Sequence, residues 1–589
     1  MQRKIHQQIL NSIYPLTYCW KIDKWYLILV IFSSVSTSCL NIFNIFVLKF
    51  LTEAVINYNK RYFITTIGIM ISLIILVNLL NMIANYKLEP FMRNHINKRI
   101  QEDIYSKSFD YSISDFDNKN FFDLYYFVLE NSKDTIINMI TQFSSFLTSL
   151  LSIGGVGSLV LRYDIFTIFI VIIGIIISTL LSLNIQKIQY KFKLDTIPSL
   201  RRIKYIDRIF YLVDYVKEIK TYKNSNLIPC SYDDSWKCMD NVTHNWIGKI
   251  GRNTFSLNMI DSLTYISILF HLGIQTIKRN ISLSVFMVVF NGSQQLVAQV
   301  KSIVETVPNI YYNSINLEKY FEYMEYNQER ENEKLNGKIE KIFIKNISFR
   351  YDEKDKEVLK SISLSINKTE KIAIVGRNGS GKSTLIKLIL GLYNPTQGNI
   401  EVNNIGLNKL DLDDYRDKVS IVYQDFRLFA FTIAQNIMMK YEINKEDELI
   451  IMEALKQVNL YDKIMKLPNG INTVFSKEFD ENGIVFSGGE MQRLALARVY
   501  AKKSDIIIMD EPFSSFDAIT EKDIFEVLNK ISKEKILIFI THSLANLSKF
   551  DKIIVMDNGE IIESGTHSEL IENNSMYYSM IEMQKNKYN

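Results

Sequence analysis

Six apolar stretches in the amino-terminal half of the chain constrain its fold more than any other feature. They lie near residues 25–50, 62–86, 134–160, 165–187, 254–277 and 283–307. At ~1.5 Å per residue, each stretch is long enough as a helix to cross a ~30 Å hydrocarbon core. The fourth contains the segment Ile165–Leu183, which has no charged residue at all. The sequence therefore predicts a membrane domain with six spans.

The connections between these stretches alternate in length and in charge. Those near 51–61, 161–164 and 278–282 are short, whereas those near 87–133 and 188–253 are long and rich in lysine and arginine. Because basic residues stay on the cytoplasmic side, we expect the short loops to face outward and both termini to be cytoplasmic. The long connections keep a helical spacing of apolar residues, which predicts helices that run beyond the membrane and return.

From about residue 331 the composition changes to that of a soluble α/β domain. We therefore expect two domains, a transmembrane domain at 1–330 and a soluble domain at 331–589. The net charge of +4 over 589 residues is too small for a nucleic-acid surface. The soluble domain must then be interpreted from its motifs.

A glycine-rich loop follows the short apolar strand 371–375 and precedes a helical pattern. It consists of Gly376, Arg377, Asn378, Gly379, Ser380, Gly381, Lys382, Ser383 and Thr384. This is the pattern GxxxxGK[ST], in which backbone N–H groups and the start of the next helix attract phosphate. Lys382 would reach the terminal phosphates of ATP, and Ser383 would bind Mg²⁺. A glycine-rich turn without this function would have no use for the Lys-Ser pair.

Two acids end the buried strand that begins at Asp505. A single acid at a strand end commonly caps a helix, but here Asp510 and Glu511 follow an apolar run downstream of a phosphate loop. The pair favours Mg²⁺ binding by Asp510 and polarisation of the attacking water by Glu511.

A second anion-binding feature opens the helix that begins near residue 487. Ser487 is suited to cap this helix, and Gly488 and Gly489 leave N–H groups exposed at its start, before Glu490. One phosphate loop and two phosphate-binding surfaces in one domain predict a dimer, in which each nucleotide lies between two copies.

This order of motifs resembles the ATP-binding cassette family and, with six preceding spans, its exporter branch. The resemblance assigns the signature sequence to Ser487–Glu490, with Glu490 where glutamine is commoner, and the adenine-stacking aromatic residue to Tyr351. It assigns the glutamine that senses Mg²⁺ and the membrane domain to Gln424, and the switch histidine to His542. The segment that crosses between two cassettes corresponds to Ser514–Asp517.

The resemblance also implies contacts between membrane domain and cassette. It places the first coupling helix, a short element that touches the cassette, at Asp115–Asp123 and the second near Glu218 and Lys220. Lys382, Asp510, Glu511 and His542 are all present, so each copy should hydrolyse ATP.

The implied fold is a six-helix all-α transmembrane domain with long cytoplasmic helical extensions, followed by an α/β P-loop ATPase domain. The implied activity is ATP-driven export across the cell membrane by a homodimer that alternates between inward- and outward-facing states, with ATP and Mg²⁺ as cofactors. The abundance of Ile, Asn and Lys favours a bacterial source. A lipid flippase, or a membrane-bound ATPase that senses or regulates without transport, remain the alternatives.

Amide side chains mark one face of two spans and indicate where a substrate would pass. They are Asn78, Asn81 and Asn85 in the second span and Asn291, Gln295 and Gln299 in the sixth. Their three- and four-residue steps place each set on one helix face. Amides are costly to leave in lipid, so the two stripes predict a wet pathway for a large amphipathic substrate, preferably a peptide; hydrogen bonding between helices is the alternative. Asp261 in the fifth span needs a partner or a substrate cation.

Overall fold

A computed structural model of the chain describes residues 2–222, 226–326, 333–352, 356–513, 518–542, 544 and 546–588. The chain divides into two compact units. The first comprises Met1–Phe109 and Asn120–Tyr326, and the second comprises Asp110–Lys119 and Asn327–Asn589. The expected domain boundary at residue 330 stays a prediction, to which the structure adds that residues 110–119 group with the second unit.

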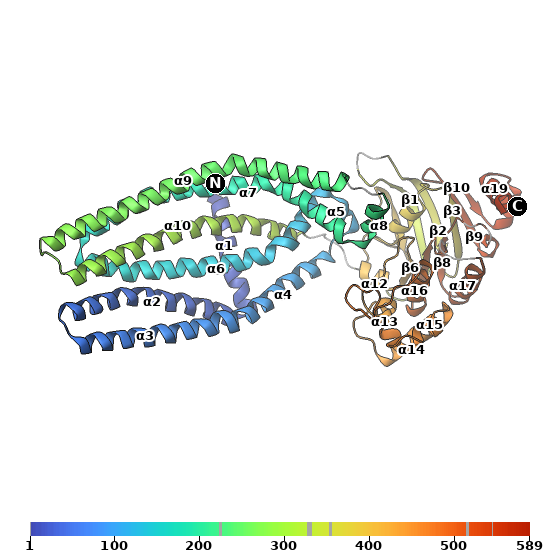
Figure 1. Cartoon of the computed structure of the whole chain (residues 1–589). Coiled ribbons are helices and arrows are strands. Elements are labelled where there is room, and N and C mark those ends of the chain that lie inside the picture. Colours follow the sequence, from blue (N-terminus) through green and yellow to red (C-terminus); the bar gives the residue numbers. More distant parts are fainter. Residues whose placement is uncertain are drawn as a thin grey trace. The chain divides into compact units, whose positions relative to one another are not determined.

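The first unit is built from long helices (Figure 1). They are α1 (Gln2–Ile22), α2 (Lys24–Ile56), α3 (Lys60–Met82), a π-helical segment (Ile83–Leu88), α4 (Glu89–Ser108), α6 (Lys119–Tyr163), α7 (Ile165–Tyr211), α8 (Val213–Thr221), α9 (Leu227–Ile277) and α10 (Leu283–Glu325). Among the described residues, six helices are long and apolar enough to cross a membrane. No element was expected before the first span, so α1 is a finding of the structure.

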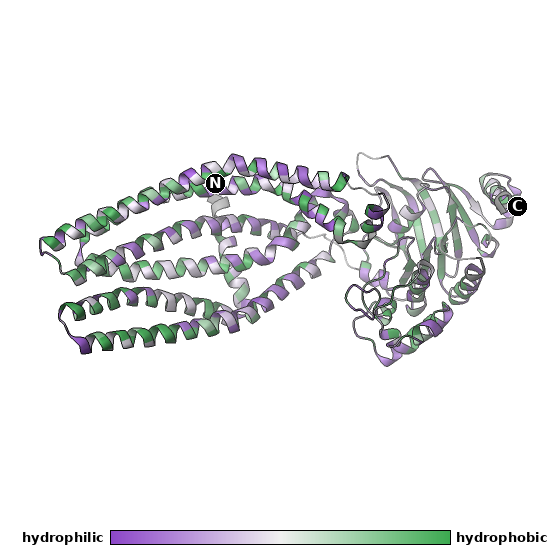
Figure 2. Ribbon diagram, in the orientation of Figure 1, coloured by the Kyte–Doolittle hydropathy of each residue, from purple (hydrophilic) through white to green (hydrophobic). Residues whose placement is uncertain are grey.

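Polar residues in the short connections start the long helices. Asp23, Asn59 and Asp164 each accept a hydrogen bond from a backbone N–H in the first turn of α2, α3 and α7, and Ser282 does so for α10. Such caps satisfy donors that the helix itself leaves free. The hydrophobic helix α3 continues into the hydrophilic α4 (Figure 2). The expected helical extensions beyond the spans are therefore confirmed.

Small residues let the long helices approach closely. A Cβ added to Gly174 of α7 would lie 2.5 Å from the Thr264 hydroxyl of α9, and one added to Gly292 of α10 would lie 2.8 Å from Val160 of α6. Helices in membranes associate through such close packing, because lipid offers no hydrophobic drive between them.

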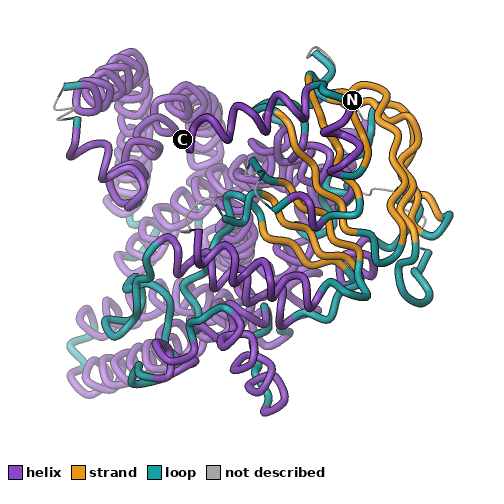
Figure 3. Tube along the Cα trace, turned by 90° about the vertical axis from the view of Figure 1, so that its right-hand side faces the viewer, coloured by secondary structure: helices purple, strands orange, loops and turns teal. Residues whose placement is uncertain are grey.

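The second unit contains two sheets with helices packed alongside (Figure 3). The smaller sheet has the order β2-β1-β4-β5, and the larger has the order β10-β9-β3-β8-β7-β6. The strands are β1 (Lys341–Phe349), β2 (Leu359–Asn367), β3 (Lys371–Gly376), β4 (Gln397–Val402), β5 (Ile405–Gly406), β6 (Val419–Val422), β7 (Ile506–Asp510), β8 (Ile536–Ile540), β9 (Lys552–Asp557) and β10 (Glu560–Gly565). In the larger sheet only β10 pairs in antiparallel fashion.

Helices of the second unit flank these strands. They are α5 (Ile113–Asp117), α11 (Lys382–Ile389), α12 (Leu412–Asp417), α13 (Ile433–Met438), α14 (Lys445–Gln457), α15 (Tyr461–Met465), α16 (Gly488–Ala501), α17 (Ala518–Ile531), α18 (His567–Glu572) and α19 (Met576–Tyr588), with 3₁₀ turns at Gly470–Asn472 and Leu547–Lys549.

The central parallel strands are buried on both faces. Along β7, Ile507 and Met509 belong to one hydrophobic cluster, whereas Ile506 and Ile508 belong to another on the opposite face. This alternation follows from the two-residue period of a strand, and continuous apolar sequences are typical of parallel sheets covered on both sides. Strands β3, β8 and β7 are parallel neighbours. Their carboxyl ends therefore lie next to each other, at the edge where α/β proteins bind ligands.

Candidate nucleotide-binding site

A pocket of about 330 Å³ lies at the carboxyl ends of these strands, a volume within the ~300–1,000 Å³ of small-molecule sites. Its lining brings together residues that are far apart in the sequence. They are Val358, Asn378, Gly379, Ser380, Gly381, Lys382, Ser383, Thr384, Gln424, Glu511 and His542. Val358 had no sequence signal, because an apolar residue before a strand resembles any other.

The phosphate loop has a backbone that favours glycine. Gly379 and Gly381 have φ of 80° and 98°, values that residues with a Cβ rarely adopt. Gly381 is the N-cap of α11 and leaves its first N–H groups without a side-chain cap. The Ser380 hydroxyl is buried at the pocket without a hydrogen-bond partner among the described residues. Free donors at a helix start fit a phosphate group.

Lys382 is buried beneath this loop. Its ammonium donates to the carbonyls of Gly376 and Arg377, both at 3.0 Å. Burial lowers the pKa of Lys382, and the charges of Glu511 and Asp510 oppose this shift. An ammonium has three donors, so one remains for a phosphate oxygen. Arg377 itself is exposed and enters the site only through its carbonyl.

Hard oxygen donors converge beside the loop. The Ser383 hydroxyl donates to Asp510 Oδ1 at 3.3 Å. Burial raises the pKa of Asp510, and the Ser383 hydrogen bond partly opposes the shift. Hydroxyl, carboxylate and amide oxygens are ligands that Mg²⁺ accepts, so Ser383, Asp510 and the neighbouring Gln424 fit the metal predicted from the sequence.

Glu511 is held between the two residues that the resemblance singled out. Its Oε2 accepts from Gln424 Nε2 at 3.0 Å, and its Oε1 lies 2.7 Å from His542 Nε2. Glu511 has a φ of 49°, and a residue other than glycine at positive φ stores strain that is typical of functional sites. The geometry fixes the carboxylate at the pocket wall, where it can act on a water molecule.

Tyr351 lies next to the pocket and is 44% exposed. Its hydroxyl lies 3.0 Å from the Thr384 hydroxyl, and the Lys387 ammonium lies over its ring, 5.6 Å from the centroid. Phe349 and Tyr393 contact it edge-on, with ring centroids 4.9 Å and 5.4 Å away. The aromatic contacts hold the ring, and the exposed part of Tyr351 can contact a base.

Replacement of Tyr351 by alanine should raise the KM for ATP by about tenfold and leave kcat nearly unchanged. Stacking of a base on an aromatic ring is worth ~1–3 kcal/mol by alanine substitution, and among the described residues Tyr351 makes no recorded contact with the Glu511 carboxylate. Tyr351→Phe is the matched control, because it keeps the ring and removes only the bond to Thr384. A KM for Tyr351→Ala equal to that of the wild type would exclude Tyr351 from adenine binding.

The signature residues do not belong to this pocket. Ser487 and Gly488 are exposed at the start of α16, and Ser487–Glu490 are absent from the described pocket lining. Glu490 and Ser487 form a reciprocal capping box, and Glu490 also pairs with Lys463 at 2.5 Å. Lys463 lowers the pKa of Glu490. The Glu490 carboxylate therefore makes two interactions within its own domain. Ser514–Asp517, expected to cross between cassettes, lie outside the described residues.

The segment 115–123, where the first coupling helix was expected, is divided: residues 115–119 group with the second unit and residues 120–123 with the first. Helix α5 covers only 115–117 of this segment, and its Asp117 accepts a hydrogen bond from the Tyr393 hydroxyl. The coupling role stays a prediction. Tyr393 had no sequence signal, yet its ring also packs edge-on against the ring of Tyr351. Glu218 and Lys220 lie in α8 of the first unit.

The residues that were expected to line a substrate pathway differ in their surroundings. Asn78 and Asn85 are exposed, and Asn81 accepts a hydrogen bond from Ser36 of α2. Asn291, Gln295 and Gln299 are half-buried along α10, and Asn291 donates to Met287 in its own helix. Asp261 pairs with Lys301, at 3.2 Å, and the sequence analysis had not identified this partner.

The fold and site define a P-loop ATPase joined to a membrane domain. Residues 359–514 match the family described as ABC transporter. The subtilin transport ATP-binding protein SpaT of Bacillus subtilis is 28% identical over 583 residues, 93% of this chain and 90% of that protein. A putative multidrug export ATP-binding/permease protein of Staphylococcus aureus is 37% identical over 244 residues, 41% of each chain.

A bacterial Atm1-family ABC exporter with ATP bound has the same fold, with a TM-score of 0.80 at 18% identity over 95% of this chain and 98% of that chain. The chain therefore has the architecture of an ABC exporter half-transporter, one membrane domain followed by one nucleotide-binding domain, and couples ATP hydrolysis to transport. The family and fold class predicted from the sequence are confirmed.

Proposed function

We propose that the chain is a homodimeric exporter that moves an amphipathic substrate, preferably a peptide, across the cell membrane of a bacterium. Both termini and the cassette lie in the cytoplasm in this proposal. The membrane domain alternates between inward- and outward-facing states, and two molecules of ATP join the two cassettes. The lipid flippase and the regulatory ATPase remain the alternatives.

One observation carries the homodimer. Ser487 and Gly488 are exposed, and none of Ser487–Glu490 is among the described residues that line the pocket with the phosphate loop of the same chain. A helix start with free N–H groups attracts anions, but in this cassette it has no phosphate to bind. A second copy supplies that phosphate, and the pairing is reciprocal in a two-fold dimer.

In this proposal each residue of the pocket has one task. The loop N–H groups and the Lys382 ammonium hold the phosphates. Ser383, Asp510 and Gln424 would hold Mg²⁺, which would neutralise negative charge on the phosphates. Glu511 orients the attacking water and accepts its proton, and His542 fixes the Glu511 carboxylate at 2.7 Å. Tyr351 stacks on the adenine.

ATP can shift the membrane domain only through contacts that differ between its two states. The shared phosphate sites supply such contacts, because they are complete only when the cassettes are closed. The hydrogen bond between Tyr393 and Asp117 ties α5, a segment between two spans, to the cassette. Closure thus pulls on the membrane helices, and hydrolysis releases them.

Two observations favour a peptide. SpaT, similar over 93% of this chain, is named for the transport of subtilin, which is a peptide. Gln295 and Gln299 are half-buried on one face of α10, where their amides can bind backbone groups of a peptide. The second-span stripe contributes less, because Asn81 bonds to α2 and thus serves helix packing.

The test is ATP-dependent uptake of subtilin into vesicles that expose the cassettes. We expect uptake by the wild type, and Gln295→Leu combined with Gln299→Leu should raise the half-maximal subtilin concentration about tenfold, because two hydrogen bonds of ~0.5–1.5 kcal/mol each are lost. Gln294→Leu, next to the stripe on the same helix, is the matched control. If the double variant transports subtilin like the wild type, the stripe is structural. If no peptide is taken up or stimulates the ATPase, the peptide assignment fails.

A further inference from the structure

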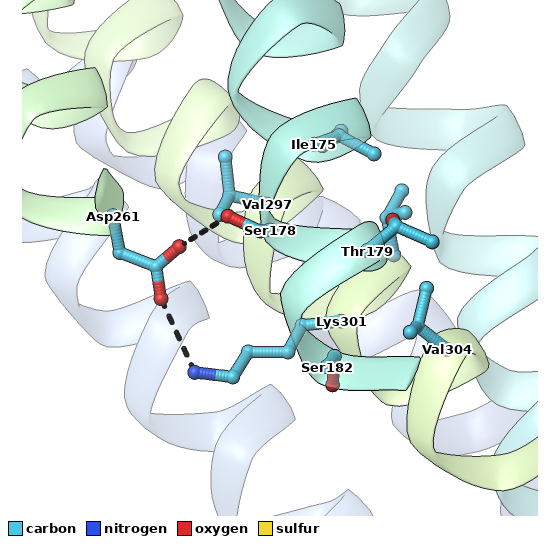
Figure 4. Close-up of a pocket in the computed structure, with 9 residues that line it drawn as sticks. Ile175, Ser178, Thr179, Ser182, Asp261, Val297, Lys301 and Val304 are labelled. Atoms are coloured by element: carbon cyan, nitrogen blue, oxygen red, sulfur yellow. Dashed lines mark hydrogen bonds and ion pairs between the residues drawn. The ribbon is translucent and has the colours of Figure 1, made fainter. Parts of the chain in front are cut away.

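An ion pair and a hydrogen bond connect three helices of the membrane domain (Figure 4). Asp261 of α9 accepts a hydrogen bond from Ser178 of α7 at 2.9 Å through Oδ1. Its other oxygen, Oδ2, lies 3.2 Å from the ammonium of Lys301 of α10. The three residues line one small pocket with Thr179, Ser182 and apolar side chains that include Val297 and Val304.

The pair lies within the apolar parts of the helices, toward the ends that are distant from the short loops. At ~1.5 Å per residue, Asp261 is about 24 Å from the end of α9 at Ile277, and Lys301 is about 27 Å from the start of α10 at Leu283. In the sequence, Asp261 is the one Asp, Glu, Lys or Arg between Arg252 and Lys278. With the short loops outside, as proposed above, the pair lies in the inner part of a ~30 Å core. Substrate from the cytoplasm would reach this depth in an inward-facing state.

A purely structural role explains the pair poorly. Apolar residues of similar size are often as stabilising as a buried ion pair, since both charges must leave water. Charged residues within spans are costly and commonly mark substrate pathways. The Lys301 side chain is also 33% exposed, against 16% for Asp261. Its ammonium has three donors, and Asp261 is its one recorded acceptor among the described residues.

The pocket is too small to hold a substrate group in this structure. Its volume of about 10 Å³ gives room for about one water molecule. A substrate group can therefore enter only if the Asp261–Lys301 contact opens. Opening without a replacement would leave two unpaired charges within the membrane, which is strongly destabilising.

We propose that Asp261 and Lys301 form a charge-exchange site for a substrate that carries an ammonium and a carboxylate close together. Lys301 releases Asp261 and binds the substrate carboxylate, and Asp261 binds the substrate ammonium. Every charge is paired before and after the exchange. The inference rests on the proposed export function and narrows its substrate class to amphipathic molecules with both charges on one polar end.

The exchange explains how such a site would discriminate between substrates of different charge. A substrate with one charge opens the pair but satisfies only one partner, so it leaves the other protein charge unpaired in a low-dielectric region. A neutral substrate makes no ion pair at all. Specificity therefore comes from the penalty on the wrong substrate as well as from attraction of the right one.

The test measures binding of four forms of one probe to the full-length protein in lipid nanodiscs. The probes are N-octanoyl-lysine, its methyl ester, its ε-acetyl derivative and the doubly blocked form, each titrated by calorimetry against empty nanodiscs. We expect N-octanoyl-lysine to bind at least about tenfold more tightly than each singly blocked form, since leaving one charge of the pair without a partner is strongly destabilising. Equal binding of the four probes, or no binding of N-octanoyl-lysine, overturns the proposal.

Two variants separate the site from general membrane affinity. Asp261→Asn combined with Lys301→Met contains no unpaired charge, so it should fold, and it should bind all four probes alike. The matched control is Lys49→Met with Glu53→Gln, which removes another ion pair of a membrane helix, with a distance of 3.8 Å, and should keep the wild-type preference. Persistence of that preference in the Asp261→Asn, Lys301→Met variant would contradict the assignment. Subtilin uptake, measured separately, reports whether the export function itself holds.

Discussion

Glu511→Gln should lower the rate of ATP hydrolysis by ~10²–10⁴-fold, the usual contribution of a positioned general base, while ATP binding persists. The glutamine side chain has the shape of glutamate, but it cannot accept the proton of the attacking water. The phosphate contacts from the loop and Lys382 remain, as does the aromatic ring of Tyr351. Because nucleotide binds but is not consumed, the closed dimer should accumulate.

The measurement compares ATPase rate, retention of labelled ATP and the closed dimer fraction in the variant and in the wild type. Glu560→Gln, an exposed position on β10 that pairs with Lys360 at 3.7 Å, is a control that should leave all three unchanged. A Glu511→Gln protein that hydrolyses ATP at the wild-type rate would remove Glu511 from the mechanism. Loss of ATP binding would instead place Glu511 among the residues that hold the nucleotide.

The phosphate loop could be predicted from the sequence because its parts are contiguous. A strand, a glycine-rich loop and a Lys-Ser pair before a helix specify Lys382 and Ser383 by spacing alone. Gln424, Glu511 and His542 are separated by long segments. The role of Glu511 was predicted from its place after an apolar strand, whereas the roles of Gln424 and His542 came from the resemblance. Their convergence depends on the strand order, in which β8 lies between β3 and β7. Local sequence patterns do not record that order.

Other interactions could be identified only from the structure, because they join segments that are distant in the sequence. Lys301 lies in the predicted sixth span, but only packing of α10 against α9 identifies it as the partner of Asp261. The hydrogen bond from Tyr393 to Asp117 joins a cassette residue to a segment 276 positions earlier. The capping box explains why a carboxylate at residue 490 is suited to this helix start. Each interaction depends on a side chain whose partner has no fixed spacing from it.

Lys382→Ala and Ser487→Arg should each abolish ATPase activity as homodimers, yet activity should return when the two variants are combined. Removing a cation that holds the reacting phosphates should cost at least ~10²-fold, as removal of one transition-state donor does. Arginine at residue 487 fills the space in front of the N–H groups of α16. If each site uses the phosphate loop of one copy and the signature of the other, a mixed dimer has one damaged site and one intact site. After random 1:1 pairing, about a quarter of the wild-type sites are intact.

The decisive control places both substitutions on one chain and pairs it with the wild type. In that mixed dimer both shared sites are damaged, because one lacks Lys382 and the other lacks a usable signature. Dimers isolated through two different tags should therefore be active in the first arrangement and inactive in the second, although they contain the same two substitutions. Sites that are complete within one chain would reverse this result, since the wild-type copy would then keep its own activity. Inactivity of the first arrangement would likewise contradict a shared site.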